Sequence, residues 1–179
     1  MRAVIALALV AASPALVEAD DDAGDDAEAK PAAATPDAMG RVDKGTLGVG
    51  IMIGEPVGFC ARLYLSDDTA IQGAVGAAFI GDGIQVHADY VFHPYILQTR
   101  ESFVLATYVG PGVRIIQYDK GREETFIALG LRAVGGLLFD FKNPLDAFIE
   151  VAGVLEYGFA DDEGFGPALN VGAGVRYYF

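Results

Sequence analysis

The sequence predicts an all-β fold, an eight-stranded antiparallel up-and-down β-barrel that crosses a membrane, preceded by a signal peptide and a disordered acidic spacer. Three observations predict it. From Thr46 onward, apolar residues recur with a period of two, which is the side-chain repeat of a β-strand. The apolar rows hold almost no charge, whereas the rows between them carry arginines, acids and histidines. Aromatic residues gather near the ends of the expected strands.

Residues 1–19 have the features of a secretory signal peptide. Arg2 gives a positive start, residues 3–12 form an apolar run, and the segment that ends at Ala19 offers the small residues that a signal peptidase reads. The run is too short to span a bilayer, which needs ~20 apolar residues. The alternative is a buried N-terminal helix.

Residues 20–45 are expected to be a disordered spacer. They carry eight acids against three bases, much Ala and Pro, and no aromatic residue, so they have too little apolar surface to offset the entropy of ordering. Residues 46–179 hold sixteen acids against eight bases, which argues against a nucleic-acid-binding face. The single cysteine, Cys60, has no disulfide partner in the chain and is expected to be a small apolar filler.

Eight strands are expected in residues 46–179, joined by segments rich in Gly, Pro and charge such as "GEPVG", "YDKGREET" and "ADDEGFG". Their expected ranges are 47–53, 59–65, 71–79, 84–92, 103–118, 126–141, 145–159 and 167–179. Pro111 falls inside the fifth strand, where a proline removes a donor from the hydrogen-bond ladder. A bulge or a bend is therefore expected there.

The rows opposite the apolar rows are polar, and the barrel interpretation assigns them to the lumen. The expected lumen network consists of Arg62, His87, Asp89, Arg114, Arg132, Glu150, Glu156, Asn170 and Arg176. In a soluble sandwich the polar rows would be the solvent-exposed face, and the apolar rows of the two sheets would pack together as a core. Rows free of guarding charge and strands of 10 to 16 residues favour a transmembrane barrel, because soluble strands are usually ~5 to 6 residues long.

Two aromatic rims are expected, because amphipathic rings favour the headgroup level of a bilayer. One rim comprises Phe59, Phe79, Tyr118, Phe126 and Phe159, and the other Tyr90, Phe92, Tyr95, Phe103, Phe139, Phe141, Tyr177 and Phe179. Eight strands leave an interior just large enough for side chains to fill. The four lumen arginines and the facing acids therefore predict a plug of ion pairs and no continuous wide pore.

The residue pattern offers weak candidates for catalysis or metal binding. His87 and Asp89 share one face of the fourth strand, and such a pair could orient an imidazole for lipid acyl transfer. Ser66 and Ser102 both fall at turns, so no serine is expected beside them. His87, Asp89 and His93 on one strand span ~20 Å and are not expected to converge on a metal. No enzymatic activity, no metal and no cofactor is expected.

The closing strand "NVGAGVRYYF" alternates apolar residues and ends in an aromatic residue. With it, residues 46–179 resemble the small outer-membrane barrels of Gram-negative bacteria, the OmpA-like and OmpX-like transmembrane domains. The stretches "GEPVGFCARLYLSDDTAIQGAVG" and "VHADYVFH" also resemble a group of uncharacterised small envelope barrels. The resemblance implies that Val175, Tyr177 and Phe179 form the signal read by the barrel-assembly machinery. The chain departs from typical members by lacking tryptophan and by its short outer loops.

The resemblance also implies a topology in the bacterial outer membrane with both termini periplasmic. Outer loops would be 54–58, 80–83, 118–125 and 160–166, and inner turns 66–69, 94–102 and 142–145. The function expected is that of a structural barrel with a plugged or very narrow lumen. It would contact membrane lipids and lipopolysaccharide, bind no nucleic acid and remain a monomer. The alternatives are a cell-surface binding module acting through 118–125 and 160–166, or a lipid-modifying enzyme using His87 and Asp89.

Overall fold

The computed structural model of the chain describes residues 32–33, 44–78, 83–119, 125–159 and 164–179, and these form strands and no helix. The strands are β1 (Ala32–Ala33), β2 (Leu47–Gly54), β3 (Val57–Tyr64), β4 (Thr69–Ala78), β5 (Gly83–Phe92), β6 (Tyr95–Thr99), β7 (Phe103–Asp119), β8 (Thr125–Phe141), β9 (Leu145–Gly158) and β10 (Phe165–Tyr178). Within these ranges, no helix is long and apolar enough to cross a membrane.

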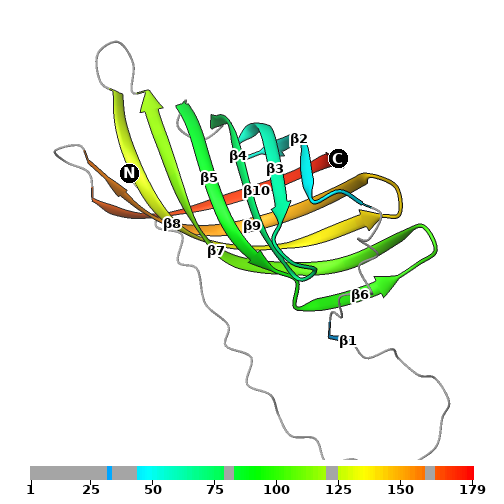
Figure 1. Cartoon of the computed structure of the whole chain (residues 1–179). Coiled ribbons are helices and arrows are strands. Elements are labelled where there is room, and N and C mark those ends of the chain that lie inside the picture. Colours follow the sequence, from blue (N-terminus) through cyan, green and yellow to red (C-terminus); the bar gives the residue numbers. More distant parts are fainter. Residues whose placement is uncertain (1–31, 34–43, 79–82, 120–124, 160–163) are drawn as a thin grey trace, which may run out of the picture.

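The strands close into a barrel (Figure 1). Each strand from β2 to β5 pairs antiparallel with its neighbour, as do β7 to β10, and β5 pairs with β7. The ring closes where β10 pairs with β2. Because β5 and β6 both pair with β7, they share one position in the wall, and β1 pairs with β6 outside the ring. The prediction of an eight-stranded antiparallel barrel is confirmed.

The strand registers define how strongly the strands tilt. Starting at Gly54 on β2, the registers of β10, β9, β8, β7, β5, β4 and β3 lead back to position 44, ten residues earlier in the chain. Such a stagger accompanies strands tilted by roughly 35–45° to the barrel axis. With eight strands, the interior is only wide enough for side chains.

The distribution of polar and apolar side chains is the reverse of that in a soluble protein. Large apolar side chains are exposed around the wall, with Phe59 at 72% and Leu131 at 69%, while Arg62 and Asp89 are at most 2% exposed. Soluble proteins rarely expose a continuous apolar patch above a few hundred Å². The soluble-sandwich alternative is wrong, because its apolar rows would face each other instead of pointing away from a closed ring.

The segment expected to be an inner turn, 94–102, contains a strand. Tyr95–Thr99 forms β6 and pairs with the first residues of β7, so the turn is confined to the residues between Thr99 and Phe103. The register of β6 shifts between Ile96 and Gln98. The pairing of β6 with β7 is therefore irregular at this point.

Of the two alternatives expected at Pro111, a bulge or a bend, the bulge is absent. The β7–β8 register runs unbroken through Pro111 opposite Ala133. On the other side, the β5–β7 ladder is interrupted after Asp89 opposite Gly112 and resumes at Phe92 opposite Val109 in the same register. The physical reason is that proline removes one donor without adding a residue, so a ladder can lose pairs without slipping.

The aromatic rims are partly as expected. Tyr90, Phe92, Tyr95, Tyr177 and Phe179 are exposed on the wall. Tyr118 is a correction, because its hydroxyl points into the lumen and donates to Glu156. Phe165, at 76% exposure, lies near Tyr157 on the outer wall and was not among the expected rim residues. Phe79 lies outside the described residues, and the side chain of Phe126 is not described.

The wall is uneven in height. We call the end with Lys44 and Phe179 the terminal end, and the end where β7 passes to β8 the loop end (Figure 1). The β2–β3 turn was expected at the rim, as loop 54–58. The turn instead lies nearer the middle of the wall, because Gly54 pairs with Gly172 while β10 extends further toward the loop end, to Phe165. Gly54 has φ of 127°, a conformation that favours glycine, and Glu55 behind it is buried.

Candidate functional site

All nine residues of the expected lumen network lie inside the barrel. Eight are at most 5% exposed, and the Glu156 side chain is 13% exposed. The period of two explains this placement, since alternate residues of every strand point to the same face. The network divides into layers between the terminal end and the loop end.

The layer nearest the terminal end is built on Asp146 and Arg176. Arg176 Nε donates to Asp146 Oδ1 at 3.0 Å, and Arg176 Nη2 donates to Asp146 Oδ2 at 3.1 Å. The Tyr178 hydroxyl donates to the same Oδ2 at 2.6 Å. Lys44 closes the end, because its Nζ donates to Asp140 and, at 2.7 Å, to the Phe141 carbonyl oxygen. The end of the segment expected to be spacer thus enters the lumen.

Arg62 occupies the next layer without a carboxylate ion pair among the described residues. Its guanidinium lies 4.6 Å from the centre of the Tyr108 ring and donates to the Tyr64 hydroxyl at 3.2 Å. It also donates to Gln72 Oε1. Stacking on aromatic faces and hydrogen bonds to neutral oxygens therefore compensate the burial of this charge.

The middle layer crosses the whole lumen. Arg132 Nε donates to Asp89 Oδ1 at 2.9 Å, and Arg132 Nη2 donates to Glu150 Oε1 at 2.5 Å. Gln72 Nε2 donates to Glu150 Oε2 at 3.0 Å, and the Tyr108 hydroxyl donates to the same oxygen at 2.8 Å. Donors from β4, β7 and β8 thus converge on acids of β5 and β9 across the lumen.

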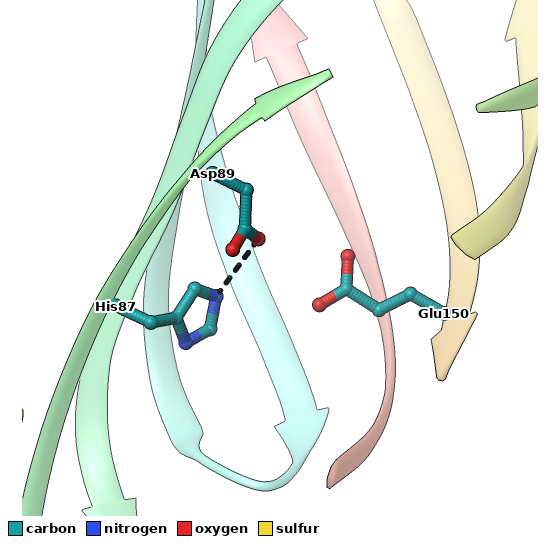
Figure 2. Close-up of side chains that lie close together, drawn as sticks. All are labelled: His87, Asp89 and Glu150. Carbon is teal, nitrogen blue, oxygen red and sulfur yellow. Dashed lines mark ion pairs between the residues drawn. The ribbon is translucent and has the colours of Figure 1, made fainter. Parts of the chain in front are cut away.

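Figure 2 shows His87 and Asp89 side by side on β5, with the Glu150 carboxylate reaching toward them from β9. One ligand atom from each lies within 4.8 Å of the others, a spacing compatible with a metal ion. His93, which was not expected to converge with His87 and Asp89, is not part of this group, and Glu150 joins it because the tertiary structure brings β9 opposite β5. The donor set fits a metal poorly, because Arg132, Gln72 and Tyr108 already occupy the carboxylate oxygens.

On the lumen side, the His87–Asp89 pair has little room for a substrate. His87 Nε2 lies 3.9 Å from Asp89 Oδ2, and Gln85 Nε2 lies 3.4 Å from His87 Nδ1. The cavity beside His87, lined also by Cys60 and Glu150, measures about 10 Å³, the room of about one water molecule. Ser66 lies in the β3–β4 turn, where its hydroxyl contacts Asp68 and Thr69.

The layer nearest the loop end holds polar atoms without a partner. Arg114 Nη1 lies 2.7 Å from Glu156 Oε1 and donates to Asn170 Oδ1 at 3.3 Å. Arg114 Nε, Asn170 Nδ2 and Gln85 Oε1 are buried and have no hydrogen-bond partner in the described structure. Tyr118 completes this layer through its bond of 2.9 Å to Glu156.

A second hollow of about 570 Å³ lies on the outer wall over β2 to β5. It arises where the small outward residues Ala61 and Gly73 lie between larger ones such as Phe59 and Val75. Its lining is mostly apolar, and it reaches the interior residues Cys60 and His87. It forms part of the apolar belt.

Val175, Tyr177 and Phe179, the expected assembly signal, lie on the outer wall at the seam between β10 and β2. They are 46%, 47% and 73% exposed, and the rings of Tyr177 and Phe179 meet at 5.1 Å. Of the outer loops 118–125 and 160–166, which the alternative of a binding module would use, residues 120–124 and 160–163 lie outside the described residues.

The interior contains further polar residues that were not among the nine expected. They are Lys44, Gln72, Gln85, Tyr108, Asp140, Asp146 and Tyr178. Most share the inward parity of an expected neighbour, such as Asp140 with Arg132 or Asp146 with Glu150, so parity alone could have identified them. Lys44 precedes β2, and no strand pattern indicates it.

No protein-family model matches the chain, and no curated protein matches it. Among solved structures, the chain is similar to Ail, the attachment invasion locus protein of Yersinia pestis. The identity is 20%, the TM-score is 0.33, and the match covers 76% of this chain and 99% of that chain. So low a TM-score supports no functional inference, and the fold is defined by the strand pairing described above.

Proposed function

We propose that this chain is a structural β-barrel of the bacterial outer membrane, with a lumen closed by its own side chains and no catalytic activity. The observation that carries the proposal is the inversion of polarity, with an exposed apolar wall and a buried charged interior. A closed barrel satisfies the backbone of every paired strand internally, which a hydrocarbon environment requires. Tilted strands need ~9–11 residues to cross a membrane, and most of the strands meet that length.

The layered interior supports a closed lumen. Side chains from β4, β5, β7, β8 and β9 meet in the middle layer. Arg62 and Tyr108 fill the neighbouring layer on the side of the terminal end. Such buried ion pairs also hold strands that are distant in sequence at defined positions. The role is therefore mechanical: the wall dissolves in lipid and the interior network keeps the cylinder rigid.

The proposed surroundings follow from the same architecture. The wall contacts membrane lipids and lipopolysaccharide, and the barrel is a monomer because strand closure uses both edges of the sheet over most of its height. Both termini are periplasmic, and Val175, Tyr177 and Phe179 present the signal for the barrel-assembly machinery. Residues 1–19 serve as the export signal, and residues 20–45 as a periplasmic spacer.

Membrane fractionation combined with gel electrophoresis tests the placement. The protein is expected in the outer-membrane fraction, and an unheated sample is expected to migrate differently from a boiled one because the folded barrel resists detergent. A protein that stays in the soluble periplasmic fraction and shows no shift on heating would contradict the proposal.

Conductance in planar bilayers tests the closed lumen. The purified barrel is expected to give no large, steady current. Arg132→Ala together with Tyr108→Ala removes two side chains that cross the middle layer, and it is expected to raise conductance if the network is the plug. A large steady current through the unaltered protein would show that the lumen is open.

A further inference from the structure

β6 presents a sheet edge that the barrel wall leaves open at the terminal end. β4 covers the edge of β5 as far as Phe92, and the turn before β4 adds one bond, from His93 N to Asp68 O at 2.9 Å. β6 continues beyond that point over Tyr95–Thr99, and its other edge is paired with β7. The edge of β6 on the side of β4 is therefore open to a further strand.

A short piece of the chain itself lies on this edge. Ala32 and Ala33 form β1 and pair antiparallel with Ile96 and Tyr95, so β1 lies beside β6 in the place that β4 leaves (Figure 1). β1 pairs with only two of the five residues of β6, and residues 97–99 have no described strand on that side. The edge thus accepts an extended backbone, and more than half of it stays uncovered.

β1 is a weak occupant of a strong edge. Alanine is depleted in strands, and Pro31, directly before β1, has no N–H to lengthen the ladder. β6 has the sequence Tyr-Ile-Leu-Gln-Thr, which is rich in residues favoured in strands and lacks the charges that usually guard an exposed edge. A longer segment of higher strand propensity would therefore pair with β6 more extensively than β1 does.

Exposed charges at the two ends of the edge define a direction. Asp67 and Asp68 lie in the turn beside the start of β6, and Arg100 follows its last residue. An antiparallel occupant has its N-terminal end toward Arg100 and its C-terminal end toward the two aspartates. An acid at the N-terminal end and a base at the C-terminal end would complement these charges. Residues 20–28, which precede β1 in the sequence, hold six acids and no base, in keeping with this direction.

A second copy of the barrel does not fit this edge. Two copies of β6 pair antiparallel in one sheet only about a two-fold axis perpendicular to the sheet. Because the barrel wall crosses the membrane, this axis would lie in the membrane plane, and the second barrel would be inserted upside down. The occupant is therefore a flexible segment. This exclusion rests on the proposed membrane placement, whereas the open edge itself does not.

We propose that the edge of β6 binds an extended segment of another protein by strand addition, and that β1 holds the site in its absence. The segment pairs antiparallel with Tyr95–Thr99 and has an uncharged, β-branched core. An acidic residue at its N-terminal end lies toward Arg100, and a basic residue at its C-terminal end lies toward Asp67. Backbone hydrogen bonds supply the affinity, and the charges set the direction.

Fluorescence anisotropy of a labelled peptide tests the proposal, with the full chain in phosphatidylcholine nanodiscs. The probe is fluorescein-Glu-Thr-Val-Thr-Val-Thr-Lys-amide, and one peptide per barrel is expected to bind. Ala32→Pro with Ala33→Pro disrupts β1 and is expected to tighten binding about tenfold, because the site is then always vacant. Ala23→Pro with Ala27→Pro, elsewhere in the expected spacer, is the matched control and is expected to bind as the unaltered chain does.

A reversible disulfide shows where the peptide binds. Ala33→Cys and Tyr95→Cys place two thiols on paired residues of β1 and β6, and Cys60→Ala removes the remaining cysteine. The Cα atoms of such a pair lie ~4.5–5.5 Å apart, within the range that a disulfide spans. Oxidation is expected to abolish peptide binding and reduction to restore it. The chain with Cys60→Ala alone is the control and is expected to bind equally in both states.

Charge exchange tests the direction of the bound segment. Arg100→Glu is expected to weaken binding about two- to fivefold, as for an exposed ion pair, and to favour a peptide whose Glu and Lys are exchanged. Lys142→Glu, at an exposed position in the β8–β9 turn, is the matched control and is expected to change neither affinity.

Several outcomes would overturn the proposal. Binding that persists in the oxidised disulfide variant would place the peptide elsewhere, and equal affinity for the two peptides would contradict the direction. Unchanged affinity after Ala32→Pro with Ala33→Pro would show that β1 does not hold the site. Dimers of that variant in light scattering would assign the edge to a second copy. A heat-modifiable membrane barrel that binds no peptide in any variant would refute this inference and leave the proposed function standing.

Discussion

Arg132 Nε lies 2.9 Å from Asp89 Oδ1, although Arg132 belongs to β8 and Asp89 to β5, with β7 between them in the wall. The same guanidinium reaches Glu150 on β9 at 2.5 Å. One buried cation therefore connects three strands of the barrel through its interior. Such contacts hold the cylinder against shear, because they do not follow the hydrogen-bond ladders.

Arg132→Met is expected to lower the free energy of unfolding by ~3–5 kcal/mol, because it leaves two buried carboxylates without their cation. Urea unfolding in lipid vesicles, followed by the mobility of unheated samples, measures the change. Arg100→Met, at an exposed position before β7, is the matched control and should have little effect. Equal losses for the two variants would contradict the role of Arg132.

Lys44→Met is expected to destabilise the terminal end, because it removes the cation beside buried Asp140 and the donor to the Phe141 and Leu145 carbonyl oxygens. The loss should approach ~3 kcal/mol, the lower end for breaking a buried pair. Hydrogen exchange at the start of β9 should quicken. Lys142→Met, at an exposed turn position, should leave both quantities unchanged, and a similar effect there would refute the assignment.

Leu131→Arg tests whether the outer wall faces lipid. Leu131 is 69% exposed near the middle of β8, where an arginine at the bilayer midplane costs ~2–4 kcal/mol. Phe165→Arg, at the loop end of β10, should cost only ~0–1 kcal/mol because it reaches the interface. Unfolding in vesicles compares the two variants, and if Leu131→Arg cost no more than Phe165→Arg, the apolar wall would not face lipid.

Gly50→Ala tests the seam that closes the barrel. A Cβ at Gly50 would lie 1.8 Å from the Val175 carbonyl oxygen on β10, so β2 and β10 would have to separate. A loss of ~1–3 kcal/mol is expected, as for overpacking elsewhere. Gly153→Ala, where a Cβ meets no atom within 4 Å, should fold normally. The fraction of heat-modifiable protein after refolding measures both, and equal fractions would contradict the tight seam.

Much of the fold follows from local pattern. The expected strands match the observed ones closely, since side-chain alternation is a property of the extended backbone itself. Parity also placed nine polar residues on one face, and all nine lie inside. β6 escaped notice because Tyr95–Thr99 follows a proline and is short, so its pattern is too brief to separate from a turn.

The site was less predictable. The convergence of Glu150 with His87 and Asp89, and the entry of Lys44 beside Asp140, depend on strands far apart in sequence. The pattern of one strand suggested only His87, Asp89 and His93 as ligands, too widely spaced to converge, and it gave no sign of Glu150 on β9.

The sequence by itself determined which residues face outward from the barrel and which face the lumen, because a period of two is decided residue by residue along each strand. Only the tertiary structure decided which of them meet and at what height. Closing eight strands with a stagger of ten residues sets Gly54 opposite Gly172 and leaves Phe165–Leu169 without a neighbour on that side among the described residues. The position of the β2–β3 turn is a consequence of closure, which no single strand encodes.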